Sequence, residues 1–338
     1  MIIEQNTNYA YKLKYTGSPS FEKIRGLSSK FFLELPKELQ DQLHEALNRG
    51  VDELDSEPLM VAYLFSFGKM HQAKLNYAFK HLPEEILLQP EINIIDYGCG
   101  QALGIMCYAD FLRENGYEQK VKTITLIEPS EICLKRAALH ASVFFPDAEI
   151  KTVNKKFDDL TQDDIVCSEE TPTLHILSNV LDMLCFNLER FTDLVKGCLT
   201  GYNQFVCVGP YFKDSRRDDR MNEFVAYFSK EACVEIKDKR EFFPDKDWTC
   251  ALSLFSVGQQ YALPIIDFCD ESIKYYKKLS ETGDVEATFR LGKCFEKAGG
   301  VEEAADSVSP TAGIHRLPCG LPGYLILFDT HAFVHERQ

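Results

Sequence analysis

The chain has 338 residues, with 37 Lys and Arg against 52 Asp and Glu, and a formal net charge of −15. Its 45% hydrophobic and 26% charged residues exclude a chain that is disordered throughout, and the length suits about two domains, or one domain with appendages. The acidic balance argues against nucleic acid held by phosphate charge and against an anionic membrane surface.

Cysteine usage and hydropathy indicate the compartment. The 12 cysteines include no C-x-x-C pair, which argues against a zinc ribbon or an iron–sulfur cluster. Several of them stand in apolar runs such as residues 205–208. We therefore interpret them as buried free thiols in a reducing compartment. The chain starts without a signal-peptide pattern, and no apolar run approaches the ~18 residues of a membrane span. We expect a cytoplasmic protein without a metal site, since His331 and His335 lack the intervening Glu of a zinc-binding helix.

Residues 1–88 are predicted to form an arm and a helical cap. Ser56 is placed to cap a long helix, because Glu57 and Pro58 suit its first turn. Gly68 is expected to interrupt this helix before the helical pattern resumes over residues 71–82.

Residues 89–262 alternate short apolar runs with amphipathic segments. The predicted strands are residues 92–96, 123–128, 150–153, 173–178, 205–209 and 251–257. The predicted helices between them are residues 104–115, 130–144, 188–199 and 219–228. This alternation predicts βαβ units around a mostly parallel sheet, an α/β fold with helices on both faces.

The most informative motif follows the first predicted strand, where residues 96–102 read DYGCGQA. A buried strand ends in an acid, passes through glycines and opens a helix. Ligands of open parallel sheets bind beyond the carboxyl ends of the strands, and glycines there let the backbone approach them. By itself the motif is also compatible with a tight turn that binds nothing.

Acidic residues follow the next two strands. Glu128, with Pro129 after it, ends the second strand, where a carboxylate can accept both hydroxyls of a ribose. Asp158 and Asp159 form an acidic turn after the third strand, in reach of an adenine edge, and the sequence does not choose between them.

This constellation resembles the class I S-adenosylmethionine-dependent methyltransferases over residues 90–260. The resemblance implies a Rossmann-like sheet, S-adenosylmethionine as cofactor, and methyl transfer to an unidentified acceptor. One departure is Ala102, where the family pattern usually has a third glycine. The cofactor contacts that it implies are Asp96, Gly98, Cys99, Gly100, Gln101, Glu128, Pro129, Asp158, Asp159, Ser178 and Asn179.

A nicotinamide-dependent Rossmann enzyme is the competing interpretation of the same fold. It would use G-x-G-x-x-G to place a pyrophosphate on a helix N-terminus. Here the glycines stand at positions 98, 100 and 104, and Asp96 precedes them. A negative charge there suits a cationic sulfonium better than a pyrophosphate, so we favour methyl transfer.

The fourth strand leads into Asn179 and Asp182, our candidates for catalysis. Methyl transfer needs alignment first, and a base only when the acceptor carries a proton. We expect Asn179 to orient the acceptor and Asp182 to take its proton. In the alternative, the two residues are a helix cap and a first-turn acid.

The cap offers four further candidates for lining the entrance of the site. These are Tyr63, Lys69, His71 and Lys74, each of which can equally be an ordinary surface or core residue.

The C-terminal part follows a different pattern. Residues 263–305 resemble a single Sel1-like repeat, a helix pair of the kind that stacks with neighbours, which suggests a protein partner. Residues 306–338 form an atypical tail, which we hypothesise to be a foreign ending. The alternative to an enzyme is a non-catalytic scaffold that binds a cofactor or a partner.

Overall fold

A computed structural model describes residues 3–4, 7–14, 17–50, 52–210, 216–228, 241–242, 249–258, 313–314 and 327–328. The chain divides into two compact units, Met1–Pro264 and Ile265–Gln338. The described part of the second unit is a short antiparallel pair, β8 (Gly313–Ile314) with β9 (Leu327–Phe328). The expected repeat over residues 263–305 and most of the expected tail therefore lie outside the described residues.

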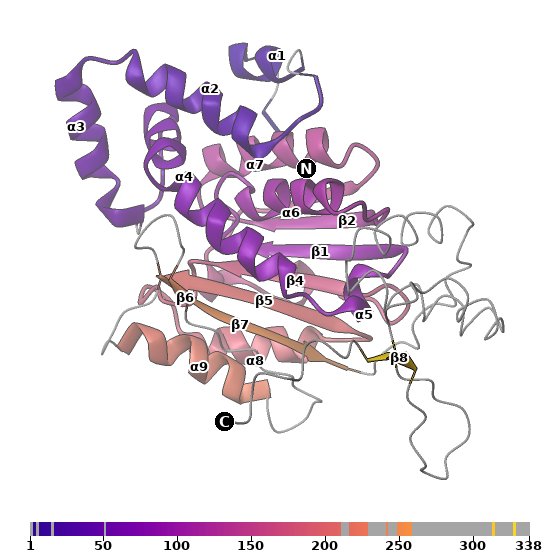
Figure 1. The fold of residues 1–338 in the computed structure, drawn as a ribbon. Coiled ribbons are helices and arrows are strands. Elements are labelled where there is room, and N and C mark those ends of the chain that lie inside the picture. Colours follow the sequence, from indigo (N-terminus) through magenta and orange to yellow (C-terminus); the bar gives the residue numbers. More distant parts are fainter. Residues whose placement is uncertain are drawn as a thin grey trace, which may run out of the picture. The chain divides into compact units, whose positions relative to one another are not determined.

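A seven-stranded sheet forms the centre of the first unit (Figure 1). Its order is β3-β2-β1-β4-β5-β7-β6, with β1 to β5 parallel and β7 antiparallel to both β5 and β6. The strands are β1 (Glu91–Tyr97), β2 (Lys120–Ile127), β3 (Glu149–Val153), β4 (Thr173–Ser178), β5 (Asn203–Pro210), β6 (Glu241–Phe242) and β7 (Thr249–Val257). The predicted α/β class is confirmed, and all six predicted strands occur.

The strand order determines where a ligand can bind. From β1 the chain builds outward through β2 and β3, then crosses back to place β4 on the other side of β1. The connections after β1 and β4 therefore diverge, and ligands of open α/β sheets bind at such a point, beyond the carboxyl ends of the strands.

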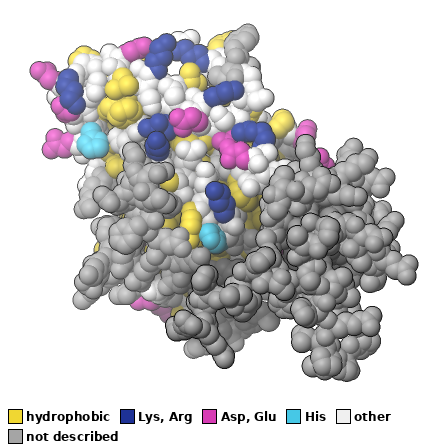
Figure 2. All heavy atoms as spheres, viewed as in Figure 1, with side chains coloured by type: hydrophobic (Ala, Val, Ile, Leu, Met, Phe, Trp, Pro, Cys, Tyr) yellow, Lys and Arg dark blue, Asp and Glu magenta, His cyan; other side chains and the backbone are white. Residues whose placement is uncertain are grey.

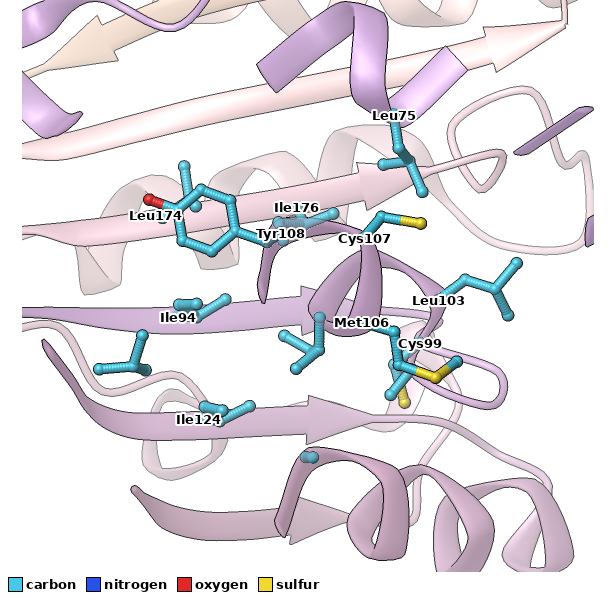
Figure 3. Packing of buried hydrophobic residues seen from close by; sticks show 14 of the residues in the cluster. Leu75, Ile94, Cys99, Leu103, Met106, Cys107, Tyr108, Ile124, Leu174 and Ile176 are labelled. Atoms are coloured by element: carbon cyan, nitrogen blue, oxygen red, sulfur yellow. The ribbon is translucent and has the colours of Figure 1, made fainter. Parts of the chain in front are cut away.

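Helices cover both faces of the sheet. Alternate residues such as Ile94 and Ile124 pack under α4, α6 and α7, and Figure 3 shows side chains of α4 and α6 over β1, β2 and β4. The intervening residues, such as Ile95 and Phe205, pack against α8 and α9. Each fully buried aliphatic or aromatic side chain contributes about 1.5–3 kcal/mol, so both layers hold the strand ends in place. The helices are α4 (Glu57–Lys80), α6 (Leu103–Glu114), α7 (Glu131–Phe144), α8 (Leu188–Cys198) and α9 (Arg216–Phe228).

The helices that precede the sheet require one correction. Helix α4 runs through Gly68 without a break, so the predicted interruption is wrong. A Cβ at Gly68 would lie 3.3 Å from the ring of Phe21, which shows that the glycine allows α2 to pack closely. The remaining helices are α1 (Asn8–Lys14), α2 (Phe21–Leu33), α3 (Lys37–Ala46) and the short α5 (Glu84–Leu87).

The surface carries charges of both signs. Figure 2 shows Lys and Arg side chains interspersed with Asp and Glu over the coloured part of that face. Interspersed signs weaken the long-range attraction that a phosphate backbone would need. Among the helices that the structure describes, none has both the length and the apolar composition of a membrane span.

Candidate functional site

The glycine loop joins β1 to α6 and faces the tip of β4. Gly98 and Gly100 both adopt left-handed backbone conformations, with φ of 62° and 52°. A Cβ at Gly98 would lie 2.6 Å from Cγ1 of Val180, whereas a Cβ at Gly100 would meet no described atom within 4 Å. The close approach of Val180, just after β4, therefore requires a glycine at position 98. The backbone of Gly100, in contrast, faces open space.

Ala102 keeps the conformation of a glycine. It precedes α6 with φ 63° and ψ 42°, and its side chain is fully buried. A non-glycine residue in this region costs roughly 1–2 kcal/mol. Ala102 thus adopts a left-handed conformation that a glycine would adopt at lower cost.

Glu128 joins the glycine loop to the tip of β2. One carboxylate oxygen accepts a hydrogen bond from the backbone N–H of Gly100 and the other from that of Ser130, both at 3.0 Å. Burial raises the pKa of Glu128 to about 7, although the two amide hydrogen bonds oppose this shift. The next residue, Pro129, is held through its carbonyl oxygen, which accepts from Nδ2 of Asn154 at 2.7 Å.

Asp96 is a buried acid at the end of β1. Its side chain is buried, and its Oδ2 has no hydrogen-bond partner within the described part of the chain. Burial, together with the charge of Glu128, raises the pKa of Asp96 well above its usual range. A Cβ at Gly104 would lie 3.1 Å from this oxygen, so the glycine makes room for the carboxyl group. Buried carboxyl groups are normally paired, and a donor or cation arriving here would be stabilised.

Cys99 and Gln101 hold the loop from behind. Nε2 of Gln101 donates to the carbonyl oxygen of Met60 on α4, at 2.9 Å. The carbonyl oxygen of Gln101 lies 2.8 Å from Nδ1 of His140 on α7. Burial raises the pKa of the Cys99 thiol well above its usual range, so this cysteine packs as a neutral group.

The acidic turn after β3 places an aromatic ring beside the loop. Asp158 is half-buried and accepts from the backbone N–H of Asn187 at 3.0 Å, whereas Asp159 is exposed. Both belong to a single 3₁₀ turn, Phe157–Asp159. The Phe157 ring would lie 3.5 Å from a Cβ at Gly98. Sequence reasoning missed Phe157, although an aromatic residue directly before an acidic pair was a usable signal.

Asn179 stands at the end of β4 in a left-handed conformation, with φ 59°. Its backbone N–H donates to the carbonyl oxygen of Val208 at 2.6 Å, and its Nδ2 donates to Oγ of Ser178 at 3.0 Å. Helix α8 begins at Leu188 with Asn187 as its cap. The alternative in which Asn179 and Asp182 begin a helix is therefore wrong.

Three residues of α4 gather around Asn179. Nζ of Lys74 donates to Oδ1 of Asn179 at 3.2 Å, and Nδ2 of Asn179 lies 3.3 Å from Nδ1 of His71. The Tyr63 hydroxyl lies 3.5 Å from the same nitrogen of His71. We call Tyr63, His71, Lys74 and Asn179 the polar cluster. Lys69, the fourth candidate from this helix, is exposed and is not part of it.

Burial shifts the titration of this cluster. It lowers the pKa of Lys74 to about 8, against the opposing influence of Cys250 and Asp182. It lowers the pKa of His71 to about 3, so the imidazole is neutral at physiological pH. Burial also raises the pKa of the Tyr63 hydroxyl, with Glu128 and Asp182 adding to the effect. The cap thus brings a buried amine and a neutral imidazole to the tip of β4.

Metal ligation finds no support in the residues that the structure places. Across the described ranges, no group of three or more His, Cys, Asp and Glu side chains could hold an ion. His331 and His335 lie outside the described residues.

Comparison with known proteins finds solved structures of limited similarity. No protein-family model matches the chain, and no curated protein matches its sequence. The N-methyltransferase NodS from Bradyrhizobium japonicum WM9 is 14% identical, with 61% of this chain and 100% of that chain covered and a TM-score of 0.36. The plantazolicin methyltransferase BpumL in complex with SAH is 12% identical, with 74% and 98% covered and a TM-score of 0.36.

A third similar structure is the geranyl diphosphate C-methyltransferase from Streptomyces coelicolor A3(2), solved with S-adenosyl-L-homocysteine. It is 9% identical, with 71% of this chain and 98% of that chain covered and a TM-score of 0.36. Identities and TM-scores this low carry no conclusion about the function of this chain. The strand order and directions of the sheet, with five parallel strands and antiparallel β7, are by themselves Rossmann-like.

Proposed function

We propose that the protein is an S-adenosylmethionine-dependent methyltransferase that transfers the methyl group directly to its acceptor. The observation that carries the proposal is the pairing of Glu128 with the backbone of Gly100, beside the buried acid Asp96. Residues 89–262 would carry the chemistry, and residues 1–88 would cover it.

The residues present fit this cofactor. An ionised carboxylate offers about four lone-pair positions, so Glu128 can accept two ribose hydroxyls while keeping its two amide hydrogen bonds. The open space over Gly100 leaves room for a ligand against the loop backbone. The unpaired Oδ2 of Asp96 suits a cationic group, and the Phe157 ring suits a flat base. Asp158 and Asp159 are then the two candidates for the adenine edge.

The protein's part in the reaction would be alignment. When bound, the cofactor supplies a methyl group that is already activated on a sulfonium. Asn179 stands at the β4 tip with its side chain fixed by Ser178 and Lys74, so it can orient an acceptor. Asp182, three residues further on, would take a proton from any acceptor that carries one.

Calorimetry with S-adenosylmethionine, S-adenosylhomocysteine and NAD tests the proposal on the full chain. We expect the first two to bind and NAD not to bind. Glu128→Gln should weaken binding at least tenfold, because an amide presents N–H groups to one of the two backbone donors. Glu131→Gln is the matched control, since Glu131 is exposed and pairs only with Lys135 on the surface of α7 in the described structure.

Two outcomes would reject the proposal. Binding of NAD alone would favour the dehydrogenase interpretation, and binding of none of the three would contradict a cofactor site. If both methionine-derived ligands bind, a screen with a labelled methyl group separates an enzyme from a non-catalytic scaffold.

A further inference from the structure

Lys74 is a buried cation with little compensation. The residue is 2% exposed, and within the described structure its one hydrogen bond goes to the neutral amide of Asn179. No described carboxylate lies within 4 Å of its ammonium group, whereas buried Arg136 contacts two of them, Glu4 and Glu57. Buried ammonium groups are costly unless they are paired. Among the described residues only one of the three N–H donors of Lys74 has a partner, so two can serve a ligand.

The groups that face Lys74 come from three directions. His71 lies on the same helix, Asp182 follows β4, and Cys250 belongs to β7. The negative charge of Asp182 favours the charged form of Lys74. A cationic ligand would meet repulsion here, and a neutral one would leave the ammonium uncompensated.

The neighbouring groups suit an acid with an apolar body. Because Nδ2 of Asn179 is a donor facing Nδ1 of His71, the neutral imidazole is assigned its proton on Nε2 and is a donor there. The Phe67 ring lies 5.4 Å from that of Tyr63 and 6.4 Å from that of His71, measured between centroids. Aromatic rings therefore stand beside the donors of the polar cluster.

We propose that the polar cluster binds the carboxylate of an aromatic carboxylic acid, with Lys74 as its counter-ion, and that this acid is the methyl acceptor. The inference rests on the proposed methyltransferase function and names its acceptor class.

The charges balance in such a reaction. A lone pair of the carboxylate oxygen forms a bond to the methyl carbon, and the carbon–sulfur bond breaks with its electron pair passing to sulfur. The products are a neutral ester and a neutral thioether, and no proton is transferred. Asp182 then has no proton to take and instead lowers the cost of burying Lys74. Methylation removes the acceptor's charge, which leaves Lys74 uncompensated again and weakens the binding of the product.

Titration of two aromatic acids and their amides tests this assignment. Benzoate and phenylacetate are titrated into the full chain saturated with S-adenosylhomocysteine, with benzamide and phenylacetamide as neutral counterparts. We expect at least one acid to bind tenfold or more tightly than its amide. Lys74→Met should abolish the difference, and Lys69→Met, on the exposed side of the same helix, should preserve it.

Asn179→Asp provides a second variant that does not depend on how Lys74→Met folds. It places a carboxylate beside the ammonium at nearly unchanged volume, so it should compete with the acids and reduce their binding at least tenfold.

The results distinguish failure of the proposed function from failure of the acceptor inference. If S-adenosylhomocysteine does not bind, the proposed function fails. If it binds, and the acids bind no more tightly than their amides or keep their advantage in Lys74→Met, the acceptor inference is overturned while the proposed function stands.

Discussion

The hydroxyl of Tyr9 lies 2.6 Å from Nε2 of His140, whose other ring nitrogen lies 2.8 Å from the carbonyl oxygen of Gln101. The first helix of the chain is thereby connected through α7 to the glycine loop. The guanidinium of Arg136 lies over the Tyr9 ring, 3.7 Å from its centroid, which fixes the ring in place. Burial lowers the pKa of His140 to about 4, so the imidazole in this connection is neutral.

Removing the Tyr9 hydroxyl should loosen the glycine loop. Tyr9→Phe keeps the ring but leaves a buried imidazole nitrogen without its partner, which costs about 1–3 kcal/mol of unfolding free energy. We expect binding of S-adenosylhomocysteine to weaken severalfold as well, with faster hydrogen exchange at the loop amides. Tyr11→Phe, at an exposed position of the same helix, should change neither quantity. A loss of stability with unchanged loop exchange would show that the connection does not reach the loop.

Alanine substitutions at Gly98 and Gly100 should have different effects, the first mainly on stability and the second mainly on ligand binding. Gly98→Ala forces a Cβ to within 2.6 Å of Val180 in a left-handed conformation, which should cost about 2–4 kcal/mol of stability. Gly100→Ala meets no described atom, so only the backbone cost of about 1–2 kcal/mol applies. Its methyl group nevertheless occupies the space above the loop, and binding of S-adenosylhomocysteine should fall at least tenfold.

Denaturant unfolding and calorimetry on the two variants check this prediction. Comparable losses of stability, or wild-type binding by Gly100→Ala, would contradict the role given to Gly100.

Cofactor affinity should depend on pH through Glu128. Its pKa is raised to about 7 in the folded protein, and ribose hydroxyls donate best to the ionised carboxylate. Below that pKa the group must first lose a proton, so affinity should fall by up to about tenfold per pH unit as pH decreases. The free energy of unfolding should change in the opposite direction. A raised carboxyl pKa favours the folded state at low pH, and this contribution is lost as pH rises through 7. Asp96 titrates in the same direction.

Binding of S-adenosylhomocysteine measured between pH 5.5 and 8.5 (roughly three units around that pKa) checks the first of these trends. Glu128→Gln should show a flatter profile, and a wild-type profile without any rise toward pH 8 would contradict the assignment.

The parts of the fold that the sequence predicted are those that local patterns determine. The strand at residues 173–178 was predicted with its observed bounds, because a buried apolar run needs no tertiary information. The unbroken course of α4 was not predicted, because a glycine within a helical pattern suggests a break. The reason for this glycine, its close packing against Phe21, is visible only in the structure.

The residues of the candidate site likewise include some that local motifs predicted and others that depend on tertiary packing. Glu128 and the loop glycines were visible as a motif in the sequence, and the structure places them in contact. Lys74 was indistinguishable from Lys69, because which lysine of α4 is buried depends on how the helix lies over the sheet. The link from Gln101 to Met60 was likewise invisible, as it joins elements that are far apart in sequence.

Replacing Lys74 by methionine should stabilise the protein. The substitution keeps an unbranched side chain one atom shorter than lysine, removes a buried charge, and leaves the neutral Oδ1 of Asn179 without this donor. Replacing even a buried ion pair with apolar side chains of similar volume is often neutral or stabilising by roughly 1–4 kcal/mol. Lys74 has no carboxylate within 4 Å in the described structure, so a rise in unfolding free energy is expected. Lys69→Met, an exposed change, should stay within about 0.5 kcal/mol of the wild type. A residue that lowers stability is retained where function requires it, so a gain in stability with loss of carboxylate binding would fit a ligand-binding lysine. A loss of several kcal/mol in Lys74→Met would instead show that the lysine holds α4 to β4, and its role would be structural.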